Sequence, residues 1–278
     1  MTARDVPQVG EGHGSRSRLA GMVSPNVGTG LMGLYQLALG IVFLGIWQFA
    51  SGRLVDSFII SDPIDIALRL WEWVSTGTIW PHVWATVYAT VVGFVIGAGL
   101  GVAGGLWLGL SPFLSRLLDP FIWAFNALPK VALAPLFILW FGLDIKSKVA
   151  LAAVLVVFLV FVNTFSGVRE VDQDLIDGLR IMRASRWQIL TKLIVPSATS
   201  WIFVGLKAGV PYALIGTIIG EMIASSRGLG YLVQRAGSEF DSAGVFAALA
   251  VIAALAMIFN EAVNVVQKRL ERWRIVSR

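Results

Sequence analysis

An all-α membrane protein with six transmembrane helices is the fold class that this sequence predicts, on the grounds of its composition and its apolar runs. Hydrophobic residues make up 56% of the chain, charged residues only 14%, and the mean hydropathy is +0.77. A soluble domain typically has roughly 25% charged residues, whereas a helix needs about 20 apolar residues to cross the hydrocarbon core. Six stretches meet that length, and they are residues 32–50, 85–109, 121–141, 149–168, 200–222 and 245–266.

The positions of Lys and Arg predict the side of the membrane on which each connection lies. Most of the 22 Lys and Arg residues lie in four segments: the N-terminal tail, the second-to-third connection, the polar segment between spans four and five, and the C-terminal tail. Cytoplasmic connections carry the excess of positive charge, so these four segments are expected inside the cell. An even number of spans then places both termini in the cytoplasm.

The chain divides into one membrane domain and two polar tails. Residues 1–31 are rich in Gly, Ser and Arg, which predicts a disordered cytoplasmic tail. Residues 32–266 form the six-span transmembrane domain, and residues 267–278 form a basic cytoplasmic tail. A cleaved signal peptide is not expected, because the first apolar run begins too late and is long enough to span the membrane.

The sequence lacks the groups that most enzymes and metal sites need. It has no Cys, and its two His residues, His13 and His82, are not at a metal-ligand spacing. No HExxH, GxSxG or phosphate-cradling P-loop occurs, so we expect no covalent chemistry and no bound cofactor or metal in this chain. The net charge of +5 comes from residues that flank spans rather than from a continuous basic stripe, which argues against nucleic-acid binding.

The most informative segment is the polar interruption at residues 169–199, between spans four and five. Its pattern predicts two short amphipathic helices. Four apolar residues share one face of the first helix at helical spacing, and they are Val171, Leu175, Leu179 and Met182. Ser185 is placed to N-cap the second helix, which is expected to end at Pro196. An ordered hairpin of this kind either docks a soluble partner or covers the ends of neighbouring spans, and the pattern alone leaves both open.

Span two carries a glycine ladder that predicts close helix packing. Five glycines recur at a strict four-residue spacing, and they are Gly93, Gly97, Gly101, Gly105 and Gly109. Such a stripe without side chains lets another helix approach closely. Static packing is favoured over a sliding contact in a moving bundle.

Three charged residues inside apolar runs are candidates for a translocation pathway, because intramembrane charges are costly and usually face a cavity or partner. Lys130 lies between Pro129 and Pro135, which predict a kinked or broken third span. It either lines a path for an anion or extends to the membrane surface. Lys207 and Glu221 in span five either act in gating and solute entry or serve as an ion pair or interface anchor.

The connection from residue 51 to residue 84 is expected outside the cell. Ser61 or Asp62 can cap a helix that begins at Pro63, and the tryptophans of this region suit a membrane interface. The pattern fits a surface helix or a lid over the outer mouth.

The segment DLIDGLRIMRASRWQILTKLIVPSA resembles the EAA loop of bacterial ABC importer permeases. The matches are ASRWQ at residues 184–188, then Pro196 and Ala198, while the Glu-Ala-Ala core appears as DGL at residues 177–179. The family's turn glycine falls at Arg183. Glycine adopts positive φ freely and arginine does so at a cost, so either the turn is built differently or the docking surface has an altered shape.

Two further segments are similar to the same family. PKVALAPLFILWFG at residues 129–142 resembles the nitrate, sulfonate and taurine branch, and residues 205–232 resemble the family's fifth span and the loop after it. The resemblance covers roughly residues 60–266 and implies a permease of the bacterial inner membrane, working as a homodimer by alternating access on a small anionic solute. It further implies separate ATP-binding subunits that hold ATP and Mg, and an extracytoplasmic solute-binding protein.

The resemblance also implies which residues couple the chain to the ATP-binding subunit. These are Asp174, Leu175, Asp177, Gly178, Leu179, Met182, Arg183, Ala184, Ser185 and Arg186. The alternative from another class is a secondary transporter or channel that needs no ATPase. Dependence on a separate ATP-binding subunit discriminates between the two.

Overall fold

The computed structural model describes residues 29–270. These residues divide into two compact units, one that ends at Ala50 and one that begins at Ser51. Residues 1–28 and 271–278 of the expected tails lie outside the described residues. All regular elements in the described part are helices, which confirms the predicted all-α class. The first unit contributes one described helix, α1 (Thr29–Ala50), whose apolar composition is sufficient for a membrane span and which matches the first predicted span.

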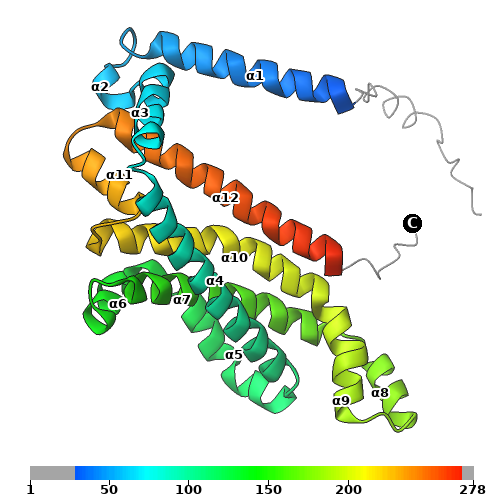
Figure 1. Cartoon of the computed structure of the whole chain (residues 1–278). Coiled ribbons are helices and arrows are strands. Elements are labelled where there is room, and N and C mark those ends of the chain that lie inside the picture. The colour runs from blue at the N-terminus through cyan, green and yellow to red at the C-terminus, as the bar shows by residue number, and fades with distance from the viewer. Residues whose placement is uncertain (1–28, 271–278) are drawn as a thin grey trace, which may run out of the picture. The chain divides into compact units, whose positions relative to one another are not determined.

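The core of the second unit is built from three long helices, α4 (Trp80–Gly109), α7 (Ile145–Arg169) and α10 (Val195–Ala224). Helix α7 packs against both α4 and α10 (Figure 1). Small and β-branched side chains fill the space between the three helices, and the buried cluster consists of Ala98, Val156, Val160 and Ala213. The three helices thus form a close-packed layer that positions the remaining elements.

The glycine ladder of α4 faces α7. A Cβ atom at Gly97 would lie 2.6 Å from the backbone oxygen of Ala153, and one at Gly101 would lie 2.8 Å from that of Val157. The other three ladder positions, Gly93, Gly105 and Gly109, are equally crowded by α7. By contrast, Gly99 has nothing within 4 Å of its Cβ position. The stripe therefore sets the distance between α4 and α7, because any side chain there would overlap the neighbouring backbone.

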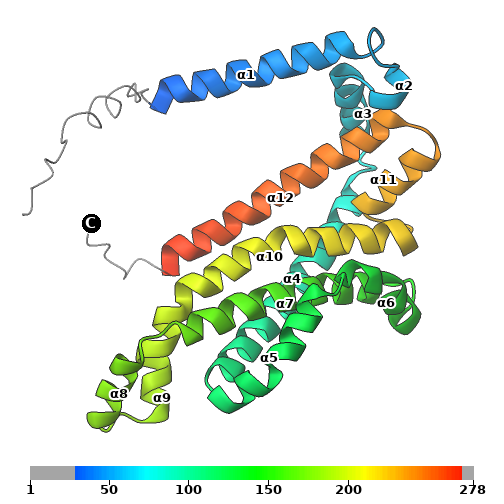
Figure 2. The ribbon, with the colours of Figure 1, turned by 180° about the vertical axis from the view of Figure 1, so that it is seen from behind.

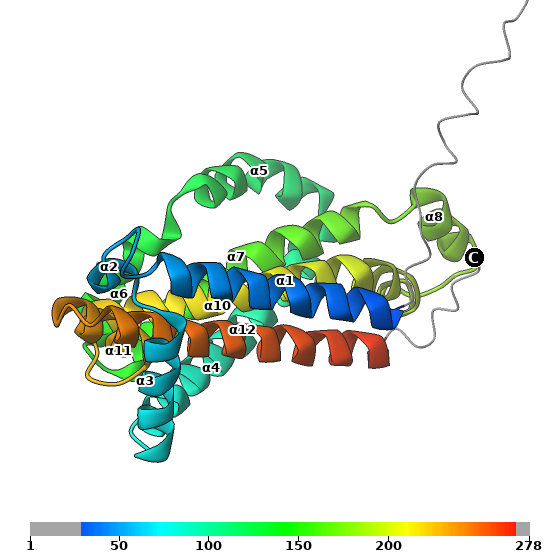
Figure 3. The ribbon, with the colours of Figure 1, turned by 90° about the horizontal axis from the view of Figure 1, so that it is seen from above.

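The third span is broken into two helices rather than kinked. Helix α5 (Pro112–Ala127) and the segment from η1 (Lys130–Leu133) through α6 (Ala134–Phe141) meet at an angle of 81°. The break falls at Leu128 and Pro129, where extended backbone precedes the proline. Pro135 lies in the first turn of α6, where its missing N–H costs nothing. Figure 3 shows α5 arching away from α7 and α10.

Between α7 and α10 the chain forms α8 (Gln173–Ile181), α9 (Arg186–Ile189) and the π-helix η2 (Leu190–Ile194). The expected stop at Pro196 is wrong, because α9, η2 and α10 form one span of 39 residues from Arg186 to Ala224. Pro196 lies in the first turn of α10 directly after the π turn. The π turn replaces the usual hydrogen bonds between residues four apart by bonds between residues five apart, and this change accommodates a residue without an N–H donor. Figure 2 shows this hairpin at one end of α10, seen from behind.

The opposite end of the unit is formed by short helices and by α12. Asp62 caps α3 (Pro63–Ser75) by accepting the Asp65 amide at 2.9 Å, as the sequence predicts. Helices α2 (Ser57–Ile60) and α11 (Leu229–Ser238) lie near the start of α12 (Ser242–Leu270), and α12 also contacts α3 and α10.

In the part of the chain that the structure describes, five helices are long and apolar enough to cross a membrane, or six if the bent pair is one span. The described helices extend beyond the predicted runs, since α4 begins at Trp80 and α12 continues to Leu270, into the expected basic tail.

Candidate functional site

The hairpin between α7 and α10 is held in shape by local capping. The Asp172 carboxylate accepts the backbone N–H of Asp174 at the start of α8. At the start of α9, the Ser185 hydroxyl accepts the Gln188 N–H, and the Gln188 side chain accepts the Ser185 N–H at 2.7 Å. This is the reciprocal capping box, which satisfies two free donors of a helix start. The predicted N-cap at Ser185 is confirmed, and the hairpin is an ordered element.

The turn between the two helices depends on Arg183. Its φ is 58°, in the left-handed region. The Arg183 N–H donates to the Arg180 carbonyl at 2.9 Å, and the Ala184 N–H donates to the Leu179 carbonyl at 3.0 Å. This pair of bonds is the Schellman motif, in which glycine is the usual residue at the left-handed position. Arginine therefore holds the conformation that glycine adopts without strain, and the turn is retained rather than rebuilt.

The hairpin has one buried and one exposed apolar surface. Val171 and Ile176 are buried in a cluster with residues of α9, η2 and α10, and Leu179 packs against it. The side chains of Leu175 and Met182, in contrast, are 55% and 78% exposed. The expectation that these residues share one face is wrong, because α8 begins only after Val171 and its inner stripe follows Ile176 instead.

We call the exposed apolar residues Leu175, Ile181 and Met182 the hairpin surface. Ile181 is 84% exposed, although the sequence pattern did not single it out. Of the other residues expected to couple, Asp177 pairs with Arg180 at 2.9 Å in solvent, and a Cβ atom at Gly178 would meet nothing within 4 Å. The hairpin thus carries exposed apolar side chains with charged side chains beside them.

A cavity of about 1120 Å³ separates the hairpin from the start of α5 and the end of α7. Four arginines line it, and they are Arg116, Arg169, Arg180 and Arg186. Of these, only Arg186 is among the residues that the sequence singles out. Ser115 of α5 also lines the cavity and is buried.

The two candidate pathway lysines lie in different surroundings. Lys130 lies at the break in the third span, where its Nζ donates to the Asn126 carbonyl at 2.9 Å and stands 5.0 Å from the centre of the Phe158 ring. Lys207 lies in α10 and is half-buried. Glu221 is 14 residues further along α10, about 21 Å away at 1.5 Å per residue. An ion pair between Lys207 and Glu221 is therefore excluded.

Glu221 is 2% exposed, and its hydrogen bonds hold the connection between α10 and α11 in place. The Thr86 hydroxyl lies 2.8 and 2.9 Å from the two carboxylate oxygens, and the Gly230 N–H donates to Oε2 at 2.9 Å. Thr86 in turn accepts the Leu229 N–H at 2.8 Å. Sequence reasoning missed Thr86 because 135 residues separate it from Glu221. The available signal was the requirement that a buried carboxylate find donors.

Two further contacts belong to this network. The Gly228 N–H donates to His82 Nδ1 at 3.1 Å, so His82 also holds the connection. Lys148 is buried beside Gly220, and its Nζ donates to the Leu143 carbonyl at 2.8 Å. Among the described residues, no group of three or more His, Cys, Asp and Glu side chains could hold a metal ion.

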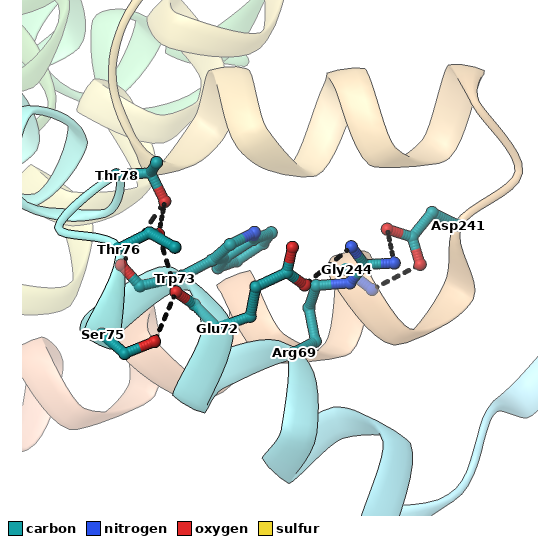
Figure 4. Close-up of polar contacts among 8 residues, drawn as sticks. All are labelled: Arg69, Glu72, Trp73, Ser75, Thr76, Thr78, Asp241 and Gly244. Atoms are coloured by element: carbon teal, nitrogen blue, oxygen red, sulfur yellow. Dashed lines mark hydrogen bonds and ion pairs between the residues drawn. The ribbon is translucent and has the colours of Figure 1, made fainter.

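The end of the unit opposite the hairpin carries polar contacts between α3 and Asp241, the residue directly before α12. Figure 4 shows Arg69 between two carboxylates: its Nη1 lies 3.2 Å from Glu72 Oε2 and its Nη2 lies 3.1 Å from Asp241 Oδ2. A cavity of about 300 Å³ lies beside these residues and reaches α11. There the Glu239 carboxylate accepts a hydrogen bond from Arg235 and raises the pKa of Arg235, so that this guanidinium stays charged.

Comparison with known proteins shows that the sequence of this chain is similar to those of transport proteins. The family described as "Binding-protein-dependent transport system inner membrane component" matches residues 93–276. The riboflavin transport system permease protein RibX of Chloroflexus aurantiacus is 36% identical over 78% of this chain and 81% of its own length. The taurine transport system permease protein TauC of Escherichia coli is 29% identical over 82% of this chain and 84% of its own.

A solved structure shows the same fold. The inward-facing methionine ABC transporter MetNI, in its CY5 native crystal form, aligns with a TM-score of 0.61 at 16% identity. The alignment covers 69% of this chain and 97% of the matched chain. At this identity the likeness concerns the fold alone.

Proposed function

Because the chain belongs to the family of binding-protein-dependent transport system inner membrane components, we propose that its hairpin docks an ATP-binding subunit and passes the motion of that subunit to the spans. The chain is an ABC importer permease of the sulfonate and taurine branch. As a permease, it is a transport subunit. ATP and Mg are held by the partner, and the permease supplies the path across the membrane.

The observation that carries this proposal is the hairpin surface. Leu175, Ile181 and Met182 remain exposed on an element whose backbone is fixed by two caps and a Schellman turn. An ordered loop that only covered its own spans would bury these side chains. Burial of one such side chain in a partner cleft contributes about 1.5–3 kcal/mol, so the surface provides enough apolar area for docking. The charged pair of Asp177 and Arg180 lies beside it.

We propose that the hairpin end lies in the cytoplasm and the α3–α11 end outside. This orientation is supported by the excess of Lys and Arg at the hairpin end and in the C-terminal tail. The ATP-binding subunits would then meet the hairpin, and an extracytoplasmic solute-binding protein would meet the end that carries Arg69 and Asp241. Two copies of this chain would enclose the path.

The solute is proposed to be a small anion with a sulfonate or similar group. Lys130 supports this, because its ammonium lies at the break of the third span with donors left over after the bond to Asn126. The half-buried Lys207 adds a second positive charge. The relative TauC carries taurine, a sulfonate, by its name, while RibX carries riboflavin by its name. Anion preference is therefore proposed from the lysines and not from any one relative.

Co-purification tests the docking. The intact chain and the single variants Leu175→Glu and Met182→Glu are purified in mild detergent from the native membrane. A charge buried in the partner cleft should lower the recovered ATP-binding subunit at least tenfold. Thr191→Glu adds the same charge at an exposed position of η2, away from the hairpin surface, and should leave recovery unchanged.

A second arm tests the function class. Membrane vesicles that contain the complex should accumulate taurine only when ATP and the solute-binding protein are supplied. If the intact chain is purified alone, and uptake continues without ATP, the chain is a secondary transporter or channel and the docking proposal is wrong.

A further inference from the structure

The cavity between the hairpin, α5 and α7 has an unusual balance of charge. Its lining includes the guanidinium groups of Arg116, Arg169, Arg180 and Arg186 and no Asp or Glu side chain. Only Arg180 has an ion-pair partner among the described residues, Asp177 at 2.9 Å. Four cations around one space repel one another, and a bound anion removes that repulsion.

The acidic residues nearest in the sequence are engaged elsewhere. Glu170 accepts a hydrogen bond from the Trp201 indole and lines a different cavity together with Asp119. Asp172 caps α8. Arg169 reaches both cavities and stands 5.4 Å from the Phe165 ring centre. No carboxylate of the described chain therefore neutralises the arginine-lined cavity from within.

Most of the remaining lining is apolar, and its polar members are Gln173 and Ser115. Leu110, Ile176, Ile189 and Leu190 line the space, and Trp187 stands at its edge with 71% of its side chain exposed. Ser115 is 2% exposed, and its hydroxyl has no hydrogen-bond partner in the described part of the chain. A buried hydroxyl without a partner is costly, and it lies directly before Arg116. The lining thus combines guanidinium groups with apolar surface.

We propose that this cavity binds an anionic glycerophospholipid, with the phosphate on the arginines and the upper acyl chain on the apolar wall. Guanidinium groups bind phosphate oxygens in bidentate fashion, and Trp187 matches the headgroup level at which tryptophan concentrates. The cavity lies at the end of α7 and beside η2, which leads into α10, so a lipid of the leaflet that adjoins these helix ends would reach it laterally. A free phosphate ion would use the arginines and leave the apolar wall unused.

The consequence is a lipid that bridges α5 to the base of the hairpin. Arg116 belongs to α5, Arg169 to α7, and Arg180 and Arg186 to the hairpin. A phosphate between them ties the broken third span to the element that docks the partner. The binding itself requires no ATP-binding subunit, so it stands or falls independently of the proposed function.

The test measures lipid binding by the full chain. The protein is purified in detergent, delipidated and titrated with dihexanoyl phosphatidylglycerol, dihexanoyl phosphatidylcholine and inorganic phosphate, with bound lipid read by native mass spectrometry. Phosphatidylglycerol should bind at least tenfold more tightly than the other two probes. The double variant Arg116→Gln/Arg169→Gln should weaken this binding at least tenfold, because each basic group near a phosphate contributes about fivefold.

A matched variant controls for charge. Lys268→Gln/Arg269→Gln removes the same two charges from the end of α12, outside the cavity, and should leave the affinity within twofold of the intact chain. If the double variant does not insert stably, Arg116→Gln and Arg169→Gln are measured singly, each with an expected loss of about fivefold.

Three results would overturn the proposal. Equal affinity for phosphatidylglycerol and phosphatidylcholine would show that the arginines do not select the headgroup. Equal affinity for phosphatidylglycerol and inorganic phosphate would show an ion site without a lipid. Unchanged lipid binding, together with lost recovery of the ATP-binding subunit in Arg116→Gln/Arg169→Gln, would assign the cavity to an acidic segment of the partner.

Discussion

Arg183 occupies a left-handed position that the Schellman turn of the hairpin requires. The chain accepts this cost because the turn is also closed by two backbone hydrogen bonds and followed at once by a capping box. For an L-residue the left-handed conformation costs roughly 1–2 kcal/mol. Replacement by glycine would remove this cost, but the greater freedom of glycine in the unfolded chain would offset about half of the gain.

We therefore expect Arg183→Gly to raise the free energy of unfolding by about 0.5–1 kcal/mol. Each kcal/mol corresponds to about 2–4 °C in melting temperature. Assembly with the ATP-binding subunit and ATP-driven uptake should be retained. Differential scanning fluorimetry of the purified chain measures the shift. Arg180→Gly is the matched control, because Arg180 lies inside α8 and the same change there should destabilise by up to about 1 kcal/mol. Destabilisation by both variants would contradict the strain argument.

Thr86 carries a second prediction at the residue scale. Thr86→Val keeps the shape of the side chain but leaves the Leu229 N–H without its acceptor and removes one donor from Glu221. The cost of about 1–3 kcal/mol should appear as faster opening of the α10–α11 connection, with amide hydrogen exchange at Leu229 and Gly230 rising about tenfold or more. Hydrogen–deuterium exchange with mass spectrometry reports it.

The control for this experiment lies one helical turn further along α4. Thr90→Val breaks the buried bond to the Thr217 hydroxyl, 3.1 Å long, and should leave exchange at Leu229 and Gly230 as in the intact chain. Equal acceleration by both variants would mean a general loosening of α4 rather than release of this connection.

At the scale of the element, the glycine ladder determines how closely α4 and α7 pack. Gly101→Ala places a Cβ atom 2.8 Å from the Val157 backbone oxygen, and the overlap should cost about 1–3 kcal/mol. Gly99→Ala, on a face with nothing within 4 Å, should be neutral or stabilise by up to about 1 kcal/mol. Melting temperatures of the two variants, measured side by side in the same detergent, should therefore shift in opposite directions or differ by several degrees. Equal shifts would contradict the role of the ladder.

Elements with strong apolar patterns were predictable from sequence, and their relations across the chain were not. The spans, the Asp62 cap of α3 and the Ser185 cap of α9 follow from local residue types. The buried face of α8 was not predicted correctly. Its helical spacing was counted from Val171, and this residue lies before the Asp172 N-cap, outside the helix. The stop expected at Pro196 failed for a related reason: a π turn placed that proline in a helix start.

The candidate site shows the same division. Local pattern located the hairpin and Arg183, but not which apolar side chains remain exposed. The four arginines of the cavity come from four different helices, and the Thr86–Glu221 contact spans 135 residues. Such contacts depend on packing of α4 against α7 and α10, which no single window of sequence contains.

At the scale of the whole molecule, the orientation is open to direct measurement because the chain has no cysteine. Single cysteines replace Asp174 on the hairpin and Asp65 on α3, both exposed, and Ala152 in the core, which is 0% exposed. A membrane-impermeant maleimide added to intact cells should label only Asp65→Cys. In inverted vesicles from cells that lack the ATP-binding subunit, which would otherwise cover the hairpin, it should label only Asp174→Cys, and Ala152→Cys should stay unlabelled in both. The reverse pattern would place the hairpin outside and contradict the docking of an ATP-binding subunit.

The unbroken run from α9 through η2 into α10 has a mechanical consequence. Its 39 residues form one continuous helical run, which bends between α9 and α10, where the π turn η2 lies (Figure 1). Glu221 lies near the end of this run that is remote from the hairpin, and its carboxylate accepts a hydrogen bond from the Gly230 N–H. A rotation imposed at the hairpin therefore reaches the α10–α11 connection through continuous helical backbone, with no loop in between to absorb it.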